Sequence, residues 1–278
     1  FKAEHLQRAG AFKFRGACNA VFALDEAQAA AGVVTHSSGN HGAALALAAR
    51  ERGIACHVVV PAGAVKSKLA AIQAYGAILH ECAPTIAARE AKCAEVQRDT
   101  GAALVHPYTD PRVIAGQGTA AMELLNAAPD LDLLVAPVGG GGLSSGTALA
   151  AAALAPNCRV IGAEPSGAAE TFASLQRGER VTEFTPDTVC DGLRGTLGEI
   201  NFDLLRRLRV DVLTVDDAAT LAALRLFWQR CKQTIEPSSA IALAAVLAHP
   251  EVFAGRRVGV VLSGGNVDLD HLSALLSK

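Results

Sequence analysis

Short apolar runs alternate with alanine-rich stretches of helical period along most of the chain. The apolar runs are 33–35, 54–60, 77–79, 133–135, 160–162, 210–215 and 258–262, and the helical stretches are 41–52, 65–75, 85–100, 143–154, 168–177 and 217–232. Strands that are separated by a helix are joined by crossovers, so they lie parallel in a sheet that is buried on both faces. This order predicts an α/β fold with mainly parallel open sheets.

The length and the composition predict two lobes. With 278 residues, of which 51% are hydrophobic, the chain can bury a large core. Proline and glycine set off the first strand–helix repeats, which predicts a small mobile domain at 32–109 and a large domain from 1–31 and 110–278. Residues 1–4 are predicted to end a strand. The glycine-rich stretch 177–198 lacks periodicity, so we expect a long loop that has a function.

The charge and the cysteine pattern narrow the class of partner. A formal net charge of −2 without runs of like charge argues against nucleic acid and membrane surfaces and favours a small-molecule ligand. The seven cysteines form no Cys-x-x-Cys pair, which indicates reduced thiols, and the eight histidines show no zinc spacing. With neither a leader nor a long apolar segment in view, we expect a cytoplasmic protein.

Two polar turns each follow an apolar run and open a helical stretch. In Ser37-Ser38-Gly39-Asn40-His41-Gly42, backbone N–H groups and the helix dipole favour an anion such as an amino-acid carboxylate. Ordinary helix capping by the serine and asparagine side chains is the alternative. The four glycines of 139–142 let the backbone wrap a phosphate. Because no Gly-Lys-Ser/Thr follows them, a monophosphate is favoured over a nucleotide.

A third candidate is Lys13, in the turn 10–16 before a helical pattern that begins near Ala17. An amine, an anion-binding turn and a phosphate cradle together are what an enzyme needs to hold pyridoxal 5'-phosphate as a Schiff base. Taken alone, Lys13 would be explained as a solvated lysine at the start of a helix, and Phe12 would be explained as a core residue. Together with the two polar turns, both residues favour a site for the cofactor. Ser263 follows the last apolar run, at the sheet edge where a hydroxyl can face a pyridine nitrogen.

These motifs resemble the serine/threonine dehydratase and serine racemase group of fold-type II pyridoxal-phosphate enzymes, which includes 3-hydroxyaspartate dehydratases. The matching segments are 11–16, 35–42, 106–107, 113–119, 139–142, 235–237 and 262–266, so the resemblance runs nearly end to end. It implies a two-lobed fold of the tryptophan-synthase-β type. It also implies that a strand and a helix of such enzymes would lie before Phe1.

The resemblance implies a role for each matching residue. Lys13 would carry the cofactor and move the α-proton, and Ser38 would be the acid/base on the opposite side of the substrate. The cofactor would be contacted by Phe12 at the ring, Asn40 at the phenolate oxygen, Ser263 at the pyridine nitrogen, and by Gly139, Gly140, Gly141, Gly142 and Leu143 at the phosphate, with Glu236 nearby. The substrate carboxylate would be held by Ser37, Ser38, Asn40 and His41.

Two further sites are implied in the same way. Glu164, the Ala168 carbonyl and Glu170 match the site at which metal-dependent members share Mg²⁺, Mn²⁺ or Ca²⁺ with waters. The alternative is a strand end followed by the acidic first turn of a helix. Arg89 matches an arginine that can meet the second carboxylate of a dicarboxylic ligand, whereas a salt bridge to Glu90 or Glu81 is its ordinary explanation.

The predicted reaction is β-elimination of water from serine, threonine or threo-3-hydroxyaspartate, which gives a 2-oxo acid and ammonia and makes the protein an ammonia-lyase. Amino-acid racemisation, with Lys13 and Ser38 as opposed bases, is the alternative. β-Replacement is less favoured because Phe14-Arg15-Gly16 follows Lys13. A non-enzymatic sensor would be expected to lack the lysine or the cradle, and both are present. We also expect a homodimer.

Overall fold

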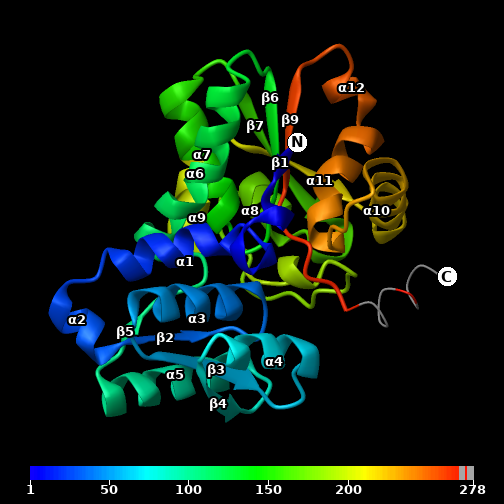
Figure 1. Cartoon of the computed structure of the whole chain (residues 1–278). Coiled ribbons are helices and arrows are strands. Elements are labelled where there is room, and N and C mark those ends of the chain that lie inside the picture. Colours follow the sequence, from blue (N-terminus) through cyan, green and yellow to red (C-terminus); the bar gives the residue numbers. More distant parts are fainter. Residues whose placement is uncertain (269–272, 274–278) are drawn as a thin grey trace. The chain divides into compact units, whose positions relative to one another are not determined.

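Figure 1 shows a computed structural model, which describes residues 1–268 and residue 273. Contacts group the chain into two units, a larger one from Phe1–Phe12 and the chain from Gln117 onward, and a smaller one from Lys13–Gly116. Segments 13–31 and 110–116, which the sequence placed in the large domain, are grouped with the smaller unit. The boundaries of a mobile domain at 32–109 stay a prediction.

The larger unit is built on a five-stranded parallel sheet of order β1-β9-β6-β7-β8. Its strands are β1 (Lys2–Ala3), β6 (Leu133–Pro137), β7 (Arg159–Pro165), β8 (Asp211–Val215) and β9 (Val258–Leu262). Its helices are α7 (Gly142–Leu154), α8 (Glu170–Arg177), α9 (Glu199–Arg207), α10 (Asp217–Cys231), α11 (Pro237–Ala248), α12 (Pro250–Phe253) and most of α6 (Pro111–Ala127).

The smaller unit is built on a four-stranded parallel sheet of order β4-β3-β2-β5. Its strands are β2 (Val33–His36), β3 (Cys56–Pro61), β4 (Ile78–Cys82) and β5 (Ala103–Leu104), and its helices are α1 (Lys13–Phe22), α2 (Glu26–Ala31), α3 (Asn40–Arg52), α4 (Lys66–Ala74) and α5 (Ile86–Thr100). Helices α3 and α5 lie on opposite faces of this sheet (Figure 1). Val34 and Val59 pack with Cys93 and Val96 of α5.

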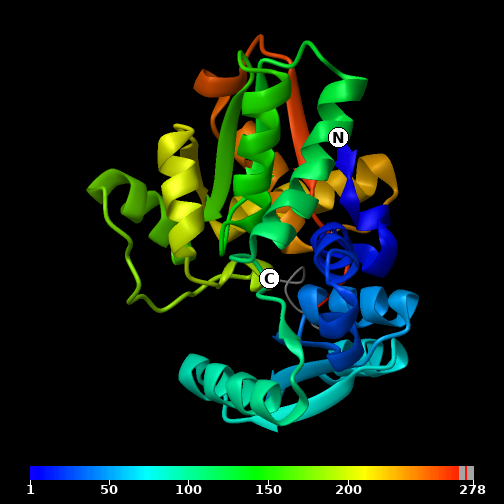
Figure 2. The ribbon, with the colours of Figure 1, turned by 90° about the vertical axis from the view of Figure 1, so that its left-hand side faces the viewer.

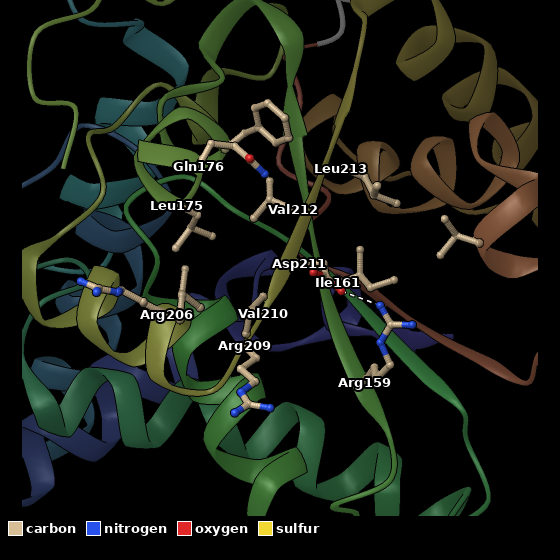
Figure 3. A pocket seen from close by; sticks show the side chains of 13 residues that line it. Arg159, Ile161, Leu175, Gln176, Arg206, Arg209, Val210, Asp211, Val212 and Leu213 are labelled. Atoms are coloured by element: carbon tan, nitrogen blue, oxygen red, sulfur yellow. Dashed lines mark hydrogen bonds and ion pairs between the residues drawn. The ribbon is translucent and has the colours of Figure 1, made fainter. Parts of the chain in front are cut away.

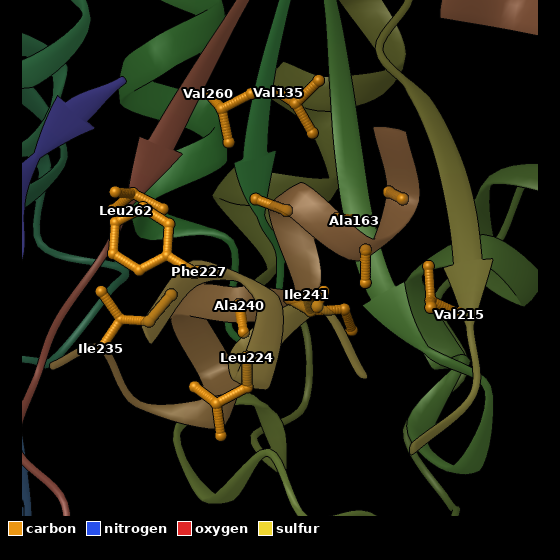
Figure 4. Packing of buried hydrophobic residues seen from close by; sticks show 14 of the residues in the cluster. Val135, Ala163, Val215, Leu224, Phe227, Ile235, Ala240, Ile241, Val260 and Leu262 are labelled. Carbon is orange, nitrogen blue, oxygen red and sulfur yellow. The ribbon is translucent and has the colours of Figure 1, made fainter. Parts of the chain in front are cut away.

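The strands of the larger unit bury both faces, and neighbouring residues take opposite faces. In β6, Leu133 and Val135 belong to one hydrophobic cluster, whereas Leu134 and Ala136 belong to another. The first cluster packs strand residues such as Val135 and Val260 against α10 and α11 (Figure 4). The second packs the other face against α6, α7 and α9. Burial on both faces explains the uninterrupted apolar runs of the sequence.

The parallel sheets bring the polar turns of the sequence to the carboxyl ends of strands. The serine turn follows β2, the glycine loop follows β6, and Ser263 follows β9. The stretch between α8 and α9 is the long loop that the sequence predicts, drawn yellow-green in Figure 2, with a 3₁₀ turn at Asp191–Leu193. It is tied down: Gly192 N donates to Ser238 Oγ at 2.9 Å, and Val189 N donates to Asp217 Oδ2 at 2.9 Å.

Several element boundaries differ from the prediction. Helix α1 begins at Lys13 and not near Ala17, because the helical backbone starts before the apolar pattern does. Helix α8 begins at Glu170 after a separate 3₁₀ turn at Ser166–Ala168, so the stretch from 168 is not one helix. Among residues 1–268, none of the helices has the length and hydropathy needed to cross a membrane.

Candidate active site

Lys13 is the first residue of α1 in the smaller unit, and its amine is held by a main-chain carbonyl. Its Nζ donates to the Pro107 carbonyl oxygen at 3.1 Å, and the side chain is partly buried. The start of α1 is fixed by a close crossing with α6: a Cβ added at Gly116 would lie 2.6 Å from the Arg15 carbonyl oxygen. The crossing therefore requires glycine at 116, and it fixes the backbone from which Lys13 extends.

The serine turn leaves the start of α3 without a side-chain cap. Gly39 is the N-cap residue and has no side chain, and the Ser37 hydroxyl accepts from Gly39 N at 3.3 Å instead of from the first turn of the helix. Among the described residues the Ser38 hydroxyl makes no hydrogen bond. A Cβ at Gly42 would overlap the Ser37 carbonyl oxygen. The capping explanation therefore does not apply, and the turn keeps the donors that an anion needs.

His41 is a buried, neutral imidazole. Its Nε2 lies 3.2 Å from the Val105 carbonyl oxygen, which only an N–H can satisfy, so Nδ1 carries the lone pair. Burial, followed by the charge of Lys13, holds the pKa of His41 well below its usual value. A neutral ring of this tautomer adds no positive charge to the turn, so an anion there would rely on backbone donors.

The rings of His106 and His36 pack against each other in the smaller unit. Their centroids lie 5.2 Å apart, edge to face, and Tyr108 packs 4.7 Å from the His106 ring. His106 Nδ1 accepts from Thr109 N at 3.2 Å and from Tyr108 N at 3.4 Å. Burial, and then His36 and Lys13, lower the pKa of His106 to about 4. His106 is thereby fixed as a neutral ring with its proton on Nε2.

Arg89 lies in α5 of the same unit and lacks the ion pairs that would explain it. Its Nε is buried and has no hydrogen-bond partner, and neither Glu81 nor Glu90 forms an ion pair with it among the described residues. Its charge contributes to the lowered pKa of His36, where burial is the main cause. The salt-bridge explanation therefore fails, and Arg89 has a donor left over for an anion.

The glycine loop of the larger unit, residues 139–142, connects β6 to α7. Gly141, the N-cap of α7, has φ +90°, a left-handed conformation that favours glycine. A Cβ at Gly139 would lie 3.0 Å from Leu193 Cα, and one at Gly141 would lie 2.6 Å from both Leu197 Cδ1 and Asn201 Cβ. The loop therefore has its protein side filled and presents bare backbone at the start of a helix, as a phosphate cradle requires.

Ser263 and Glu236 lie together at the end of β9. The Ser263 hydroxyl donates to the Ser238 carbonyl oxygen at 3.4 Å, and its own carbonyl oxygen accepts from Phe12 N at 2.9 Å. Glu236 N donates to the Gly264 carbonyl oxygen at 3.0 Å, and a Cβ at Gly264 would lie 2.7 Å from Glu236 Oε1. Phe12, Ser263 and Glu236 are therefore neighbours within the larger unit.

Glu164 and Glu170 form a buried carboxylate pair in the larger unit, 0% and 2% exposed. Glu164 accepts from Thr171 N and from Phe172 N, both at 2.8 Å, whereas Glu170 Oε2 is buried without a hydrogen-bond partner. Burial is the main reason that the pKa values rise to about 7 for Glu164 and about 9 for Glu170, whose shift also reflects the charge of Glu164. A buried carboxylate oxygen without a partner is costly, so both the cation site and the helix-turn explanation stay open for this pair.

A cavity of the larger unit is separate from the predicted site residues. Within the described part of the chain, no group of three or more His, Cys, Asp or Glu side chains lies close enough together to hold a metal ion. The cavity has a volume of about 530 Å³, follows strand β8 and is lined by residues such as Arg206, Val212 and Leu213 (Figure 3). It contains none of the predicted site residues, and its Arg159 is already paired with Asp211 at 2.5 Å. The predicted site residues therefore lie outside this cavity.

Comparison with known proteins decides the family. A family model described as "Pyridoxal-phosphate dependent enzyme" matches residues 1–264. The chain belongs to this family.

Its relatives agree with the predicted group of pyridoxal-phosphate-dependent enzymes. The chain is 49% identical over 272 residues to the beta-hydroxyaspartate dehydratase of Paracoccus denitrificans (strain Pd 1222), covering 98% of this chain and 86% of that protein. It is similar to maize serine racemase, with 43% identity, a TM-score of 0.94, and coverage of 99% and 85%. It is also similar to the processed form of threonine deaminase isoform 2 from Solanum lycopersicum, with 32% identity, a TM-score of 0.93, and coverage of 99% and 76%.

Membership of the pyridoxal-phosphate-dependent enzymes confirms the predicted family, fold class and cofactor, and confirms that the protein is an enzyme. The roles of individual residues stay predictions. In the smaller unit the structure brings Lys13, His41 and His106 close enough for their charges to interact. Sequence reasoning gave no role to His106, although the His106-Pro107 motif next to the Lys13 contact was a usable signal. It also gave no attention to Asn201, whose Nδ2 donates to the Gly140 carbonyl oxygen of the glycine loop at 2.6 Å.

Proposed function

We propose that the chain catalyses β-elimination of water from a β-hydroxy-α-amino acid, with threo-3-hydroxyaspartate preferred over serine and threonine. The products are a 2-oxo acid and ammonia, which makes the protein an ammonia-lyase. The observation that carries the preference is Arg89, whose buried Nε has no partner within the described chain. The likeness to a beta-hydroxyaspartate dehydratase supports the same substrate.

The substrate has two anionic ends, and the smaller unit offers a separate group for each. We assign the α-carboxylate to the backbone donors of Ser37, Ser38, Asn40 and His41 at the uncapped start of α3. We assign the second carboxylate to Arg89, because a guanidinium makes forked, charge-assisted hydrogen bonds to a carboxylate. Serine and threonine lack the second carboxylate and would leave this arginine unpaired.

The proposed cofactor contacts divide between several strand ends. Pyridoxal 5'-phosphate, when bound, supplies the electron sink that makes the α-proton of an amino acid removable. Gly139, Gly140, Gly141, Gly142 and Leu143 would hold its phosphate, Asn40 its phenolate oxygen, Phe12 and Glu236 its ring, and Ser263 its pyridine nitrogen. The bare glycine backbone fits a phosphate, since a Cβ would collide with the residues behind it. The Ser263 hydroxyl would turn from the Ser238 carbonyl oxygen to donate to the ring nitrogen without protonating it. An unprotonated ring is a weak electron sink, which suffices for elimination.

Lys13 is the proposed base. Its Nζ donates a hydrogen bond to the Pro107 carbonyl oxygen at 3.1 Å, which fixes the position of the amine. The nearby His41 and His106 are neutral at pH 7 because their pKa values are lowered. Rings with such low pKa values are weak bases, so the α-proton is left to Lys13, which removes it and delivers it to the leaving hydroxyl to form water.

Racemisation is the second candidate, and Ser38 favours it. Its hydroxyl has no hydrogen-bond partner within the described chain, so it is available to return a proton to the opposite face of the substrate. The likeness to maize serine racemase supports this activity. Chiral analysis of recovered serine tests it: D-serine formed by the parent enzyme and lost in Ser38→Ala would establish racemisation.

We further propose that Glu164, the Ala168 carbonyl and Glu170 hold Mg²⁺, Mn²⁺ or Ca²⁺. The orphaned Glu170 Oε2 supports this, because a hard cation would satisfy it. Ala168 lies in the 3₁₀ turn between the two carboxylates and is 1% exposed. A homodimer and a cytoplasmic location complete the proposal, as expected from the sequence.

The substrate preference is tested by measuring 2-oxo acid formation from threo-3-hydroxyaspartate and from serine in parent, Arg89→Ala and Arg98→Ala. Arg98 is the matched control, since it lies exposed near the end of the same helix. Loss of a forked ion pair of about 1.5–3 kcal/mol should lower kcat/KM for 3-hydroxyaspartate roughly 10- to 150-fold and change that for serine little. Lys13→Ala, as the inactive reference, should abolish both reactions.

If Arg89→Ala lowered kcat/KM equally for 3-hydroxyaspartate and for serine, Arg89 would not be the group that binds the second carboxylate. An inactive parent on 3-hydroxyaspartate together with an active one on serine would return the function to a serine/threonine dehydratase.

A further inference from the structure

The back of the glycine loop is held by a segment that belongs to no motif of the sequence. This segment, residues 197–201, lies at the start of α9, and its end residues Leu197 and Asn201 are fully buried. It meets the glycine loop where the loop's missing side chains would lie: a Cβ at Gly141 would contact both Leu197 and Asn201.

The contact is polar and specific at Gly140. Asn201 Nδ2 donates to the Gly140 carbonyl oxygen at 2.6 Å, and Gly198 N donates to the same oxygen at 3.2 Å. An oxygen that accepts two hydrogen bonds fixes the orientation of its whole peptide plane. The plane that begins at Gly140 also carries the N–H of Gly141, so the Asn201 amide governs where that N–H points.

The donor itself has a fixed position. The segment also lies close to Glu170, since the Leu197 backbone is among the groups that influence the pKa of the Glu170 carboxyl. Helix α9 begins directly after Gly198 and places Asn201 in its first turn. Asn201 Cβ and Leu197 Cδ1 would each lie 2.6 Å from a Cβ at Gly141, so the packing leaves room for glycine there and for nothing larger.

We propose that Asn201 is a positioning residue for the cofactor phosphate: its amide orients the peptide between Gly140 and Gly141 so that the backbone N–H groups of the glycine loop face the phosphate. The inference rests on the proposed phosphate site at residues 139–142. Asn201 itself lies behind the loop and acts through it.

The test compares two ligands that differ in the phosphate alone, pyridoxal 5'-phosphate and pyridoxal. Their dissociation constants are measured by absorbance titration for the parent, Asn201→Ala, Asn201→Asp and the control Asp203→Ala, an exposed residue of the same helix. Asn201→Asp keeps the shape and replaces the donor by an acceptor. Thermal unfolding without ligand shows which variants are folded.

Both Asn201 variants should bind pyridoxal 5'-phosphate at least fivefold more weakly, or about 1 kcal/mol, and pyridoxal within twofold of the parent. The ³¹P resonance of the bound cofactor should shift in both, while Asp203→Ala behaves as the parent does. Unchanged affinity for the phosphate ligand, or equal losses for the two ligands, would overturn the positioning role. A parent that binds both ligands equally would instead refute the phosphate site itself.

Discussion

Substitution of Gly141 by alanine tests how closely the glycine loop is enclosed. Gly141 has φ +90°, and a Cβ there would lie 2.6 Å from Asn201 Cβ and from Leu197 Cδ1. The left-handed backbone costs a non-glycine residue about 1–2 kcal/mol, and overpacking adds about 1–3 kcal/mol. Gly141→Ala should therefore lower the free energy of unfolding by roughly 2–5 kcal/mol.

Gly178→Ala is the matched control. Gly178 has φ +76° and belongs to the same unit, but a Cβ there would meet nothing within 4 Å. It should cost only the backbone term of about 1–2 kcal/mol. The difference between the two variants isolates the contact with Leu197 and Asn201.

The assay is denaturant unfolding of both variants without cofactor, so that stability is measured apart from binding. Cofactor titration follows, in which Gly141→Ala should bind weakly and Gly178→Ala as the parent does. Equal destabilisation by the two substitutions would refute the enclosure of the loop, because the backbone cost would then account for everything.

Two further predictions concern the proposed cation site at Glu164 and Glu170 and the buried ring of His106. Millimolar Mg²⁺, Mn²⁺ or Ca²⁺ should raise the melting temperature of the parent by mass action and leave Glu170→Ala unchanged, and the same shift in both proteins would exclude the carboxylate pair as the site. The pKa of His106 is lowered to about 4, so the unfolded chain binds this proton at higher pH than the folded one. The stability that the neutral His106 contributes is therefore present above about pH 6.5 and lost as the pH falls towards 4. His106→Asn should flatten this part of a curve of the free energy of unfolding against pH. An unchanged slope in the variant would contradict the lowered pKa.

The sequence predicted the class of the fold because the strands bury both faces. Runs such as 133–135 are apolar throughout, since Leu134 and Val135 face different clusters that are both dry. Helices α2, α6, α9, α11 and α12 were not placed. Helix α9 follows the aperiodic loop, and α11 is apolar nearly all round, with Ile241 and Ala242 both buried, so neither offers a clean one-sided pattern.

The candidate site was predictable where it depends on backbone and not where it depends on tertiary neighbours. The four glycines at 139–142 predict a loop without side chains, and this prediction does not depend on which residues surround the loop. The lowered pKa of His106 and the bond from Asn201 to Gly140 arise from residues far apart in sequence. For Arg89, the sequence predicted its place in a helix. Only the fold shows that no acidic side chain pairs with it among the described residues.

The strand order of the larger sheet constrains how that unit can fold during synthesis. Lys2 pairs with Val261 and Ala3 with Leu262, and β9 separates β1 from β6. Strand β1 therefore cannot form its sheet pairing until β9 has been synthesised. Strands β2 to β5 lie within residues 33–104, so the smaller sheet can close much earlier. We conclude that the larger sheet is completed last, around the late arrival of β9.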